Sequence, residues 1–128
     1  MKTILFIIFT LFGLNGCMNA QNKSYDNMDV ENFTRYLSND SVQLVDVRTP
    51  EEFAEGHIAG AKNINVFDSD FVDEAEKALD KSKPVAVYCR SGKRSADAAR
   101  ELTENGFSVT NLEGGILAWK EQHQPISY

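Results

Sequence analysis

Cysteine and histidine are scarce in this chain of 128 residues, which holds two of each. Cys17 lies where an apolar N-terminal segment ends, and Cys89 is the only thiol beyond it. A domain that begins after this segment therefore has no partner thiol for Cys89, which excludes a disulfide scaffold. The same scarcity excludes a zinc site built from several cysteines.

Positive charge is also in short supply. Lysine and arginine number 13 against 19 aspartate and glutamate residues, which gives a formal net charge of -6. A nucleic-acid binder needs a basic face that displaces counterions from phosphates, so we expect no nucleic-acid partner. Hydrophobic residues make up 42% and charged residues 25% of the chain, a balance typical of a soluble globular protein. The length that remains after a short export segment suits one domain.

A membrane-spanning hydrophobic run is the third feature that the sequence lacks. The apolar run over residues 4–14 is about eleven residues long, which is too short to cross a bilayer but typical of a secretory signal. Residues 14–17, Leu-Asn-Gly-Cys, resemble the bacterial lipobox, in which the cysteine receives a lipid and becomes the new N-terminus, although Asn15 departs from that pattern.

These observations predict a signal peptide over residues 1–16, a lipid on Cys17, a flexible polar tether over residues 17–27 and a domain over residues 28–128. The protein would then be exported and face the periplasm or the cell exterior, held to a membrane by its lipid alone. Ordinary signal cleavage near Ala20 is the alternative, because it discards Cys17 and leaves a soluble periplasmic protein.

The rest of the chain alternates between two hydrophobic patterns. Helical spacing of apolar residues predicts helices within residues 29–37, 49–55, 68–80, 95–105 and 116–119. Short apolar and β-branched runs predict strands over residues 42–47, 64–67, 85–88 and 109–112. This alternation predicts an α/β domain with a mostly parallel sheet and helices on both faces. Ligands bind such sheets beyond the carboxyl ends of the strands, and Cys89 directly follows the predicted strand over residues 85–88.

The segment after Cys89 is basic and contains a glycine. Gly92 gives the backbone the freedom to curl, so that loop amides and the positive end of the following helix converge on the sulfur as an anion cradle. Arg90, Lys93 and Arg94 add three cations within five residues, which would hold the thiol as its nucleophilic thiolate near neutral pH.

A structural role for Cys89 is the alternative, since cysteine is often a small core residue and the cations could begin a solvated helix. Against this, cations in the first turn of a helix oppose its dipole, so three of them are unfavourable without a compensating anion or thiolate. The pattern therefore favours a functional thiol.

Three separate segments resemble, in the right order, the signatures of rhodanese-like domains. The first is VDVRTPEEF at residues 45–53 with GHIAGA at residues 56–61, Asn63 and Ile64. The second is VYCRSGKRS at residues 87–95. The third comprises Gly106, Phe107, Val109, Leu112, Gly114, Gly115, Ile116, Ala118 and Trp119. The resemblance covers essentially the whole chain after the N-terminal segment.

This resemblance implies a rhodanese-like fold and a sulfurtransferase. Cys89 would take a sulfane sulfur from a small anionic donor such as thiosulfate, become a persulfide and pass the sulfur to a thiol or to cyanide. The implied binding residues are Arg90, Ser91, Gly92, Lys93, Arg94 and Ser95. Asp46 and Arg48 would form a salt bridge that braces the strand end, His57 would be structural, and neither a metal nor a cofactor is implied.

Two other functions are considered. A cysteine phosphatase or arsenate reductase of the related fold generally has an arginine six positions after the cysteine, whereas this chain has Ser95 there and Arg94 one position earlier. The shorter loop favours attack on sulfur. A rhodanese-like module that only binds a partner is the other alternative, but inert members usually lack the cysteine that is present here.

Overall fold

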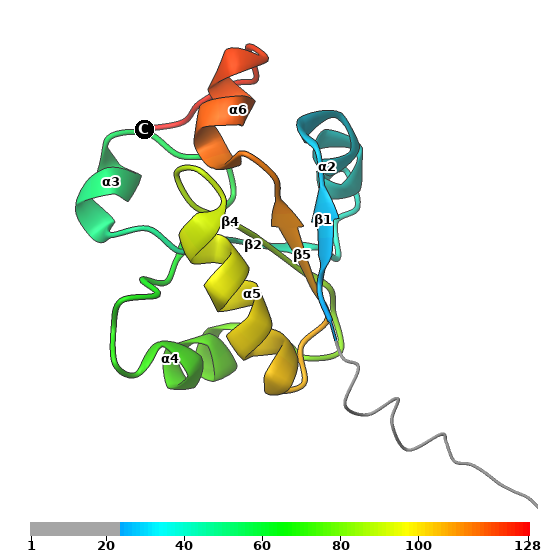
Figure 1. Cartoon of the computed structure of the whole chain (residues 1–128), viewed down its shortest axis with the longest axis vertical. Helices are drawn as coiled ribbons and strands as arrows, with labels where there is room; N and C mark the ends of the chain where they lie inside the picture. Colours follow the sequence, from blue (N-terminus) through cyan, green and yellow to red (C-terminus); the bar gives the residue numbers. More distant parts are fainter. Residues whose placement is uncertain (1–23) are drawn as a thin grey trace, which may run out of the picture.

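A five-stranded parallel sheet forms the centre of the computed structural model, which describes residues 24–128 (Figure 1). Its spatial order is β1-β5-β4-β2-β3, and every neighbouring pair of strands is parallel. The strands are β1 (Asp26–Met28), β2 (Gln43–Asp46), β3 (Lys62–Asn63), β4 (Val85–Tyr88) and β5 (Val109–Leu112). The predicted α/β class with a parallel sheet is confirmed.

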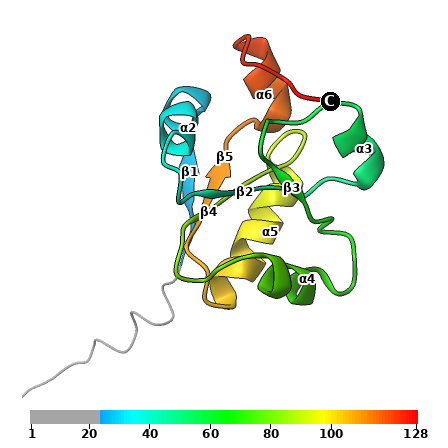
Figure 2. The same cartoon turned by 180° about the vertical axis from the view of Figure 1, so that it is seen from behind.

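Helices connect these strands and cover the sheet on both faces (Figure 1 and Figure 2). They are α2 (Val30–Leu37), α3 (Pro50–Ala54), α4 (Phe71–Ala78), α5 (Lys93–Glu104) and α6 (Gly115–Glu121). The core has two parts: α4 and α5 pack on one face of the sheet, whereas α2 and α6 pack on the other. None of the described helices is long and apolar enough to cross a membrane.

The central strand β4 shows why the core has one part on each face of the sheet. Val85 and Val87 pack with α4 and α5, whereas Ala86 and Tyr88 pack with α2 and α6. Side chains alternate across a strand, so a strand that is buried on both faces must be apolar at every position. All four residues of β4 are fully buried, and this burial fixes the strand end from which Cys89 leaves.

Side chains cap the starts of α2 and α3. The Asp29 carboxylate accepts a hydrogen bond from the Asn32 backbone N–H, 3.0 Å away, at the start of α2. The Thr49 hydroxyl accepts one from the Glu52 backbone N–H at 3.2 Å, and the Glu52 side chain accepts one from the Thr49 N–H at 3.1 Å. This reciprocal capping box begins α3 with Pro50 in its first turn.

The main differences from the sequence prediction concern β1, β3 and the start of α5. Strand β1 was not predicted, and Asp26 and Asn27 belong to it rather than to a tether. The strand predicted over residues 64–67 is found as β3 at Lys62–Asn63 instead. Helix α5 begins two residues earlier than predicted, at Lys93.

The differences at β1 and β3 have local causes. Strand β1 is a short polar edge strand held by backbone pairing with β5, so it carries no apolar pattern. After β3 the Ile64 N–H donates to the carbonyl of Asp46, the last residue of β2, and the Val66 N–H donates to the carbonyl of Val47, which follows β2, but no regular ladder forms. The predicted signal peptide, the lipid site at Cys17 and the other tether residues up to 23 lie outside the described residues.

Candidate active site

Cys89 follows the last residue of β4 and lies in a four-residue loop that ends at Gly92, directly before α5. Only 1% of the residue is exposed. Gly92 has φ +102°, a left-handed conformation that side chains other than glycine disfavour. The resulting curl brings the Gly92 backbone N–H to the Cys89 Sγ, with 3.0 Å between nitrogen and sulfur.

The Ser95 hydroxyl provides a second donor to the sulfur, at 3.3 Å. Burial raises the pKa of the Cys89 thiol, but hydrogen bonds from the Ser95 hydroxyl and from the backbone N–H groups of Ser95, Gly92 and Ser91 lower it more. The net pKa of Cys89 therefore lies below its ordinary value. The anion cradle expected around this sulfur is formed by backbone amides together with one serine hydroxyl.

Arg90 in the loop and Lys93 and Arg94 at the start of α5 have different environments. The Arg94 guanidinium forms a bidentate ion pair with the Glu52 carboxylate, with N–O distances of 2.8 and 2.9 Å, and also lies 5.4 Å from the centre of the Phe67 ring. Arg90 and Lys93 are exposed, and neither forms an ion pair with another of the residues described in the structure. The charge of Arg94 is therefore compensated before any donor binds.

Glu52 is a site residue that the sequence patterns do not single out. Its carboxylate accepts from the Arg94 guanidinium, the Thr49 backbone and the Thr49 hydroxyl. The hydrogen bonds from Arg94 are the main reason that the pKa of Glu52 is lowered to about 2. No local pattern gives this pairing, because the two residues are 42 positions apart.

The start of α6 fixes the carbonyl side of the same loop. The Ile116 N–H donates to the Cys89 carbonyl at 2.9 Å, and the Leu117 N–H donates to the Arg90 carbonyl at 3.1 Å. Gly115 lies so close that a Cβ atom at this position would overlap the Arg90 carbonyl. The loop is thus held between the first turns of α5 and α6, which leaves its own N–H groups directed at the sulfur.

Comparison with known proteins agrees with this geometry. The family model described as a rhodanese-like domain matches residues 29–122. A putative sulfurtransferase of Bacillus subtilis, YtwF, is 40% identical over 88 residues, which are 69% of this chain and 82% of that protein. A thiosulfate sulfurtransferase of Shewanella oneidensis, GlpE, is 37% identical over 100 residues, which are 77% of this chain and 95% of that one.

The chain belongs to the rhodanese-like family. A solved rhodanese-related protein from Thermoplasma volcanium superposes with a TM-score of 0.71 at 32% identity, over 80% of this chain and 98% of that one. The rhodanese-like fold implied by the three sequence segments is therefore confirmed.

A buried ion pair braces this rhodanese-like domain beneath the loop. Asp46 is fully buried and accepts hydrogen bonds from the Arg48 guanidinium and backbone N–H, the latter at 3.0 Å, while Arg48 also donates to the Gly56 carbonyl at 2.7 Å. The Tyr88 hydroxyl accepts from the Ile58 N–H at 3.0 Å. The salt bridge expected between Asp46 and Arg48 is present, and its satisfied hydrogen bonds suit a framework role.

His57 contacts the end of α3 and the C-terminal residues. Its ring stacks on Phe53, with 3.8 Å between ring centres, and its Nδ1 lies 2.9 Å from the Phe53 carbonyl oxygen. Its backbone pairs with Ser127 in an isolated β-bridge. These contacts suit the structural role expected for His57, since they join the end of α3 to the C-terminal residues.

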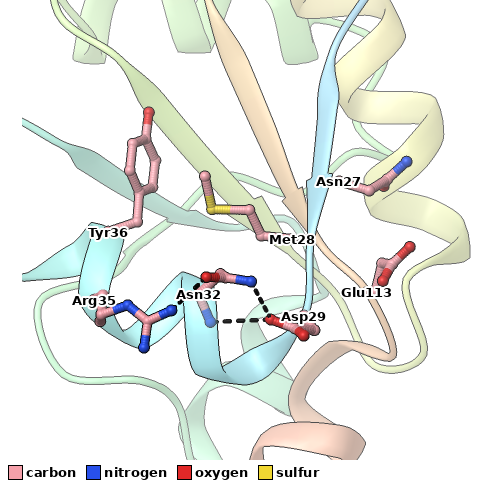
Figure 3. A pocket seen from close by; sticks show the side chains of 7 residues that line it. All are labelled: Asn27, Met28, Asp29, Asn32, Arg35, Tyr36 and Glu113. Atoms are coloured by element: carbon pink, nitrogen blue, oxygen red, sulfur yellow. Dashed lines mark hydrogen bonds between the residues drawn. The ribbon is translucent and has the colours of Figure 1, made fainter.

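The domain also has an open pocket of about 620 Å³ beside β1 and α2 (Figure 3). Its polar groups are largely paired with one another: Asp29 accepts from the Asn32 side chain at 2.9 Å, and Arg35 donates to the Asn32 side chain at 2.6 Å. The lining residues are Asn27, Met28, Asp29, Asn32, Arg35, Tyr36 and Glu113. None of them belongs to the loop from residue 89 to 92, and the pocket offers no nucleophile comparable with Cys89.

Proposed function

We propose that this rhodanese-like domain is a sulfurtransferase that carries sulfur as a persulfide on Cys89. The observation that carries the proposal is the position of the sulfur, which accepts hydrogen bonds from the Gly92 N–H and the Ser95 hydroxyl at the end of a central strand. These donors stabilise a thiolate, which is the form that attacks an electrophilic sulfur. The names of the relatives, which include thiosulfate sulfurtransferase, support the same reaction.

The reaction has two steps. First, the Cys89 thiolate attacks the outer, sulfane sulfur of thiosulfate; a new S–S bond forms, the S–S bond of thiosulfate breaks, and sulfite leaves with the electron pair. Second, an acceptor thiolate or cyanide attacks the outer sulfur of the persulfide, and the electron pair of the Cys89 S–S bond returns to the Cys89 sulfur. Arg90 and Lys93, being exposed and cationic, attract the anionic donor, while the loop amides hold the persulfide charge.

The nature of the acceptor follows from the cysteine count. The chain has no thiol other than Cys89 beyond Cys17. An internal disulfide between two cysteines of this domain is therefore impossible, and the sulfur must leave to an external acceptor. The position of Ser95 counts against a phosphatase, because its hydroxyl contacts the sulfur where such enzymes generally have an oxyanion-binding arginine.

Intact-mass measurement tests the proposal. The purified protein is incubated with excess thiosulfate, the donor is removed, and we expect one added sulfur atom that is lost on addition of cyanide or a small thiol. The Cys89→Ser variant should show neither the adduct nor turnover. Turnover by the wild-type protein without an adduct, under conditions that preserve persulfides, would mean that Cys89 is not the carrier.

Export and lipidation are a separate proposal that rests on the sequence of residues 1–17. We propose that Cys17 carries a lipid and that the domain is anchored outside the cytoplasm. The Cys17→Ser variant should then appear in the soluble fraction or keep an uncleaved N-terminus. Equal membrane attachment and an identical mature N-terminus in both proteins would favour ordinary secretion instead.

A further inference from the structure

Two side chains hold the Arg94 guanidinium. The Glu52 carboxylate accepts hydrogen bonds from both of its terminal nitrogens, at 2.8 and 2.9 Å, and its Cζ atom lies 5.4 Å from the centre of the Phe67 ring. Figure 1 and Figure 2 show α3, the segment between β3 and α4, and the start of α5, which carry these residues, on the same side of the molecule. An arginine side chain is otherwise free to adopt many rotamers, and both contacts restrict this freedom.

The two holding groups are themselves informative. The Glu52 carboxylate is fixed by the capping box, because it also accepts from the Thr49 backbone N–H and hydroxyl, each at 3.1 Å. A fixed carboxylate in a bidentate pair sets the plane of the guanidinium as well as its position. Phe67 is 67% exposed, and its contact with Arg94 gives this large apolar ring a role at the surface.

The guanidinium held in this way is close to the sulfur and still has donors to offer. Ser95, the next residue in the chain, donates to the Cys89 Sγ. Hydrogen bonds to Glu52 are the main reason that the pKa of Arg94 is raised, and the negative charge of the Cys89 thiolate raises it further. A guanidinium has five N–H groups, and within residues 24–128 two of them bond to Glu52, so three remain for a ligand.

We propose that Glu52 and Phe67 are positioning residues, which orient Arg94 so that its remaining N–H groups bind the oxyanion of the sulfur donor. This inference rests on the proposed sulfurtransferase function. Arg94 then acts at contact distance on the sulfite part of thiosulfate, whereas the exposed cations attract the donor from further away. Glu52 is an anion beside a site for anions, so it favours donor binding only because the gain from orienting Arg94 exceeds the repulsion.

Two sulfur donors that differ in their oxyanion test the proposal. Thiosulfate has a sulfonate group, whereas 2-hydroxyethyl persulfide has none. With either donor the Cys89 thiolate forms an S–S bond to the outer sulfur, the S–S bond of the donor breaks, and sulfite or 2-hydroxyethanethiolate leaves with the electron pair. Sulfur addition to Cys89 is followed by intact mass at several donor concentrations, which gives a rate constant for each donor. The readout is the ratio of the thiosulfate constant to the persulfide constant.

Glu52→Gln keeps the size of the side chain but removes its charge and one of the two acceptor oxygens. We expect the ratio to fall about tenfold, chiefly because more thiosulfate is needed for half-saturation. Phe67→Leu, at an exposed position, should lower the ratio about threefold, and it tests the proposal even if Glu52→Gln fails to fold. Glu51→Gln in the same helix and Tyr128→Leu, which replaces another exposed aromatic ring, are the matched controls and should keep the wild-type ratio.

A double-mutant comparison shows whether Glu52 acts through Arg94. In an Arg94→Ala background the carboxylate has no guanidinium to orient, so Glu52→Gln should no longer lower the ratio and should raise it by removing a negative charge. An equal fall in both backgrounds, or a ratio that is unchanged or higher in both Glu52→Gln and Phe67→Leu, would overturn the positioning proposal. Absence of a Cys89 persulfide in the wild-type protein with either donor would instead overturn the proposed function.

Discussion

At the scale of single residues, the chemistry depends on how a buried sulfur keeps its negative charge. Burial disfavours the thiolate, and without compensation it would raise the pKa of Cys89 and weaken the nucleophile. Hydrogen bonds from Gly92 and Ser95 act in the opposite direction and prevail. Arg94 adds little free positive charge, because Glu52 already compensates it.

Removing the Ser95 hydroxyl should therefore raise the pKa of the Cys89 thiol. In Ser95→Ala the thiolate loses a donor, so the rise of turnover with pH should move to higher pH, and kcat/KM for thiosulfate at neutral pH should fall by about tenfold. The pH dependence of thiolate ultraviolet absorbance measures the pKa directly. Ser91→Ala is the control, because Ser91 acts on the sulfur through its backbone N–H, which the substitution keeps. An unchanged titration in Ser95→Ala would show that the amides alone set the pKa.

The sequence singles out Cys89 as the candidate nucleophile but does not predict all of its surroundings. Cys89 stands out because an apolar strand pattern, a glycine and basic residues adjoin it within a few positions. The ion pair between Glu52 and Arg94 joins two elements that no short-range pattern relates, so the compensation of the Arg94 charge could not be predicted from the sequence. Tertiary pairing of this kind is visible only once the sheet has brought α3 beside α5.

At the scale of secondary-structure elements, the link between α3 and α5 makes a prediction about acid stability. The pKa of Glu52 is lowered from its ordinary value of 4.5 to about 2 in the folded protein, so its pairing stabilises the fold fully above about pH 4.5 and is lost as the pH falls through 2. Glu52→Gln should lower the free energy of unfolding at neutral pH by about 1–2 kcal/mol, a value reduced because the pair is partly exposed. The difference from wild type should shrink as the pH falls below 4.5 and vanish below pH 2.

Denaturant unfolding at several pH values measures this effect. Glu51→Gln provides a matched control, since Glu51 is the exposed neighbour in α3 and forms no ion pair with the described residues. A constant difference between Glu52→Gln and wild type from neutral to acid pH would contradict the assignment of the ion pair.

The junction of α6 with the loop predicts a contrast between two glycines. Gly115 and Gly60 both have positive φ, +61° and +84°, but only at Gly115 would a Cβ atom overlap the loop backbone, whereas Gly60 has open space around it. Gly60→Ala should cost about 1 kcal/mol from backbone strain and keep full activity. Gly115→Ala should cost more and also reduce sulfur transfer, because α6 must shift away from Cys89.

Thermal unfolding and thiosulfate turnover distinguish these outcomes. If Gly115→Ala unfolds at physiological temperature, turnover is measured at a lower temperature at which both variants are folded. The activities per folded molecule can then be compared. Equal activity per folded molecule in both would mean that α6 does not hold the loop.

Element boundaries show where sequence patterns lose information. The fully buried β4 was predicted within its observed limits, because burial on both faces demands an unbroken apolar run. The edge strands β1 and β3 were missed or displaced, since three and two residues of backbone pairing leave almost no pattern in the side chains. The start of α5 was placed late because Gly92, which caps it through its backbone conformation, has no side chain to signal the role.

At the scale of the whole molecule, alternation of strands and helices was sufficient to predict the sheet and the edge where the site lies. Because all parallel strands end at the same side of the sheet, the sequence already gives the end of β4 as the expected position of a ligand site. The order of the strands could not be predicted, because it depends on which crossovers pass over which face of the sheet.

The overall charge leads to the last prediction. A net charge of -6 repels an anionic donor at long range, so we expect its approach to the sulfur to depend on the exposed cations Arg90 and Lys93. Lys93→Ala and Lys83→Ala change the net charge equally. Lys83, however, lies before the first residue of β4, whereas Cys89 follows its last residue, so Lys83 is at the opposite end of the strand from the sulfur. Any difference between the two variants therefore reports position rather than total charge.

We expect Lys93→Ala to lower kcat/KM for thiosulfate by about five- to tenfold at low ionic strength, and Lys83→Ala to stay close to wild type. The gap should narrow as salt is added, because the screening length falls to about 10 Å at 0.1 M ionic strength and shortens further above it. Steady-state kinetics at several salt concentrations measure both effects. Equal losses in the two variants would mean that the donor responds to net charge alone, and a gap that persists at high salt would mean that Lys93 contacts the bound donor directly instead of attracting it through the solvent.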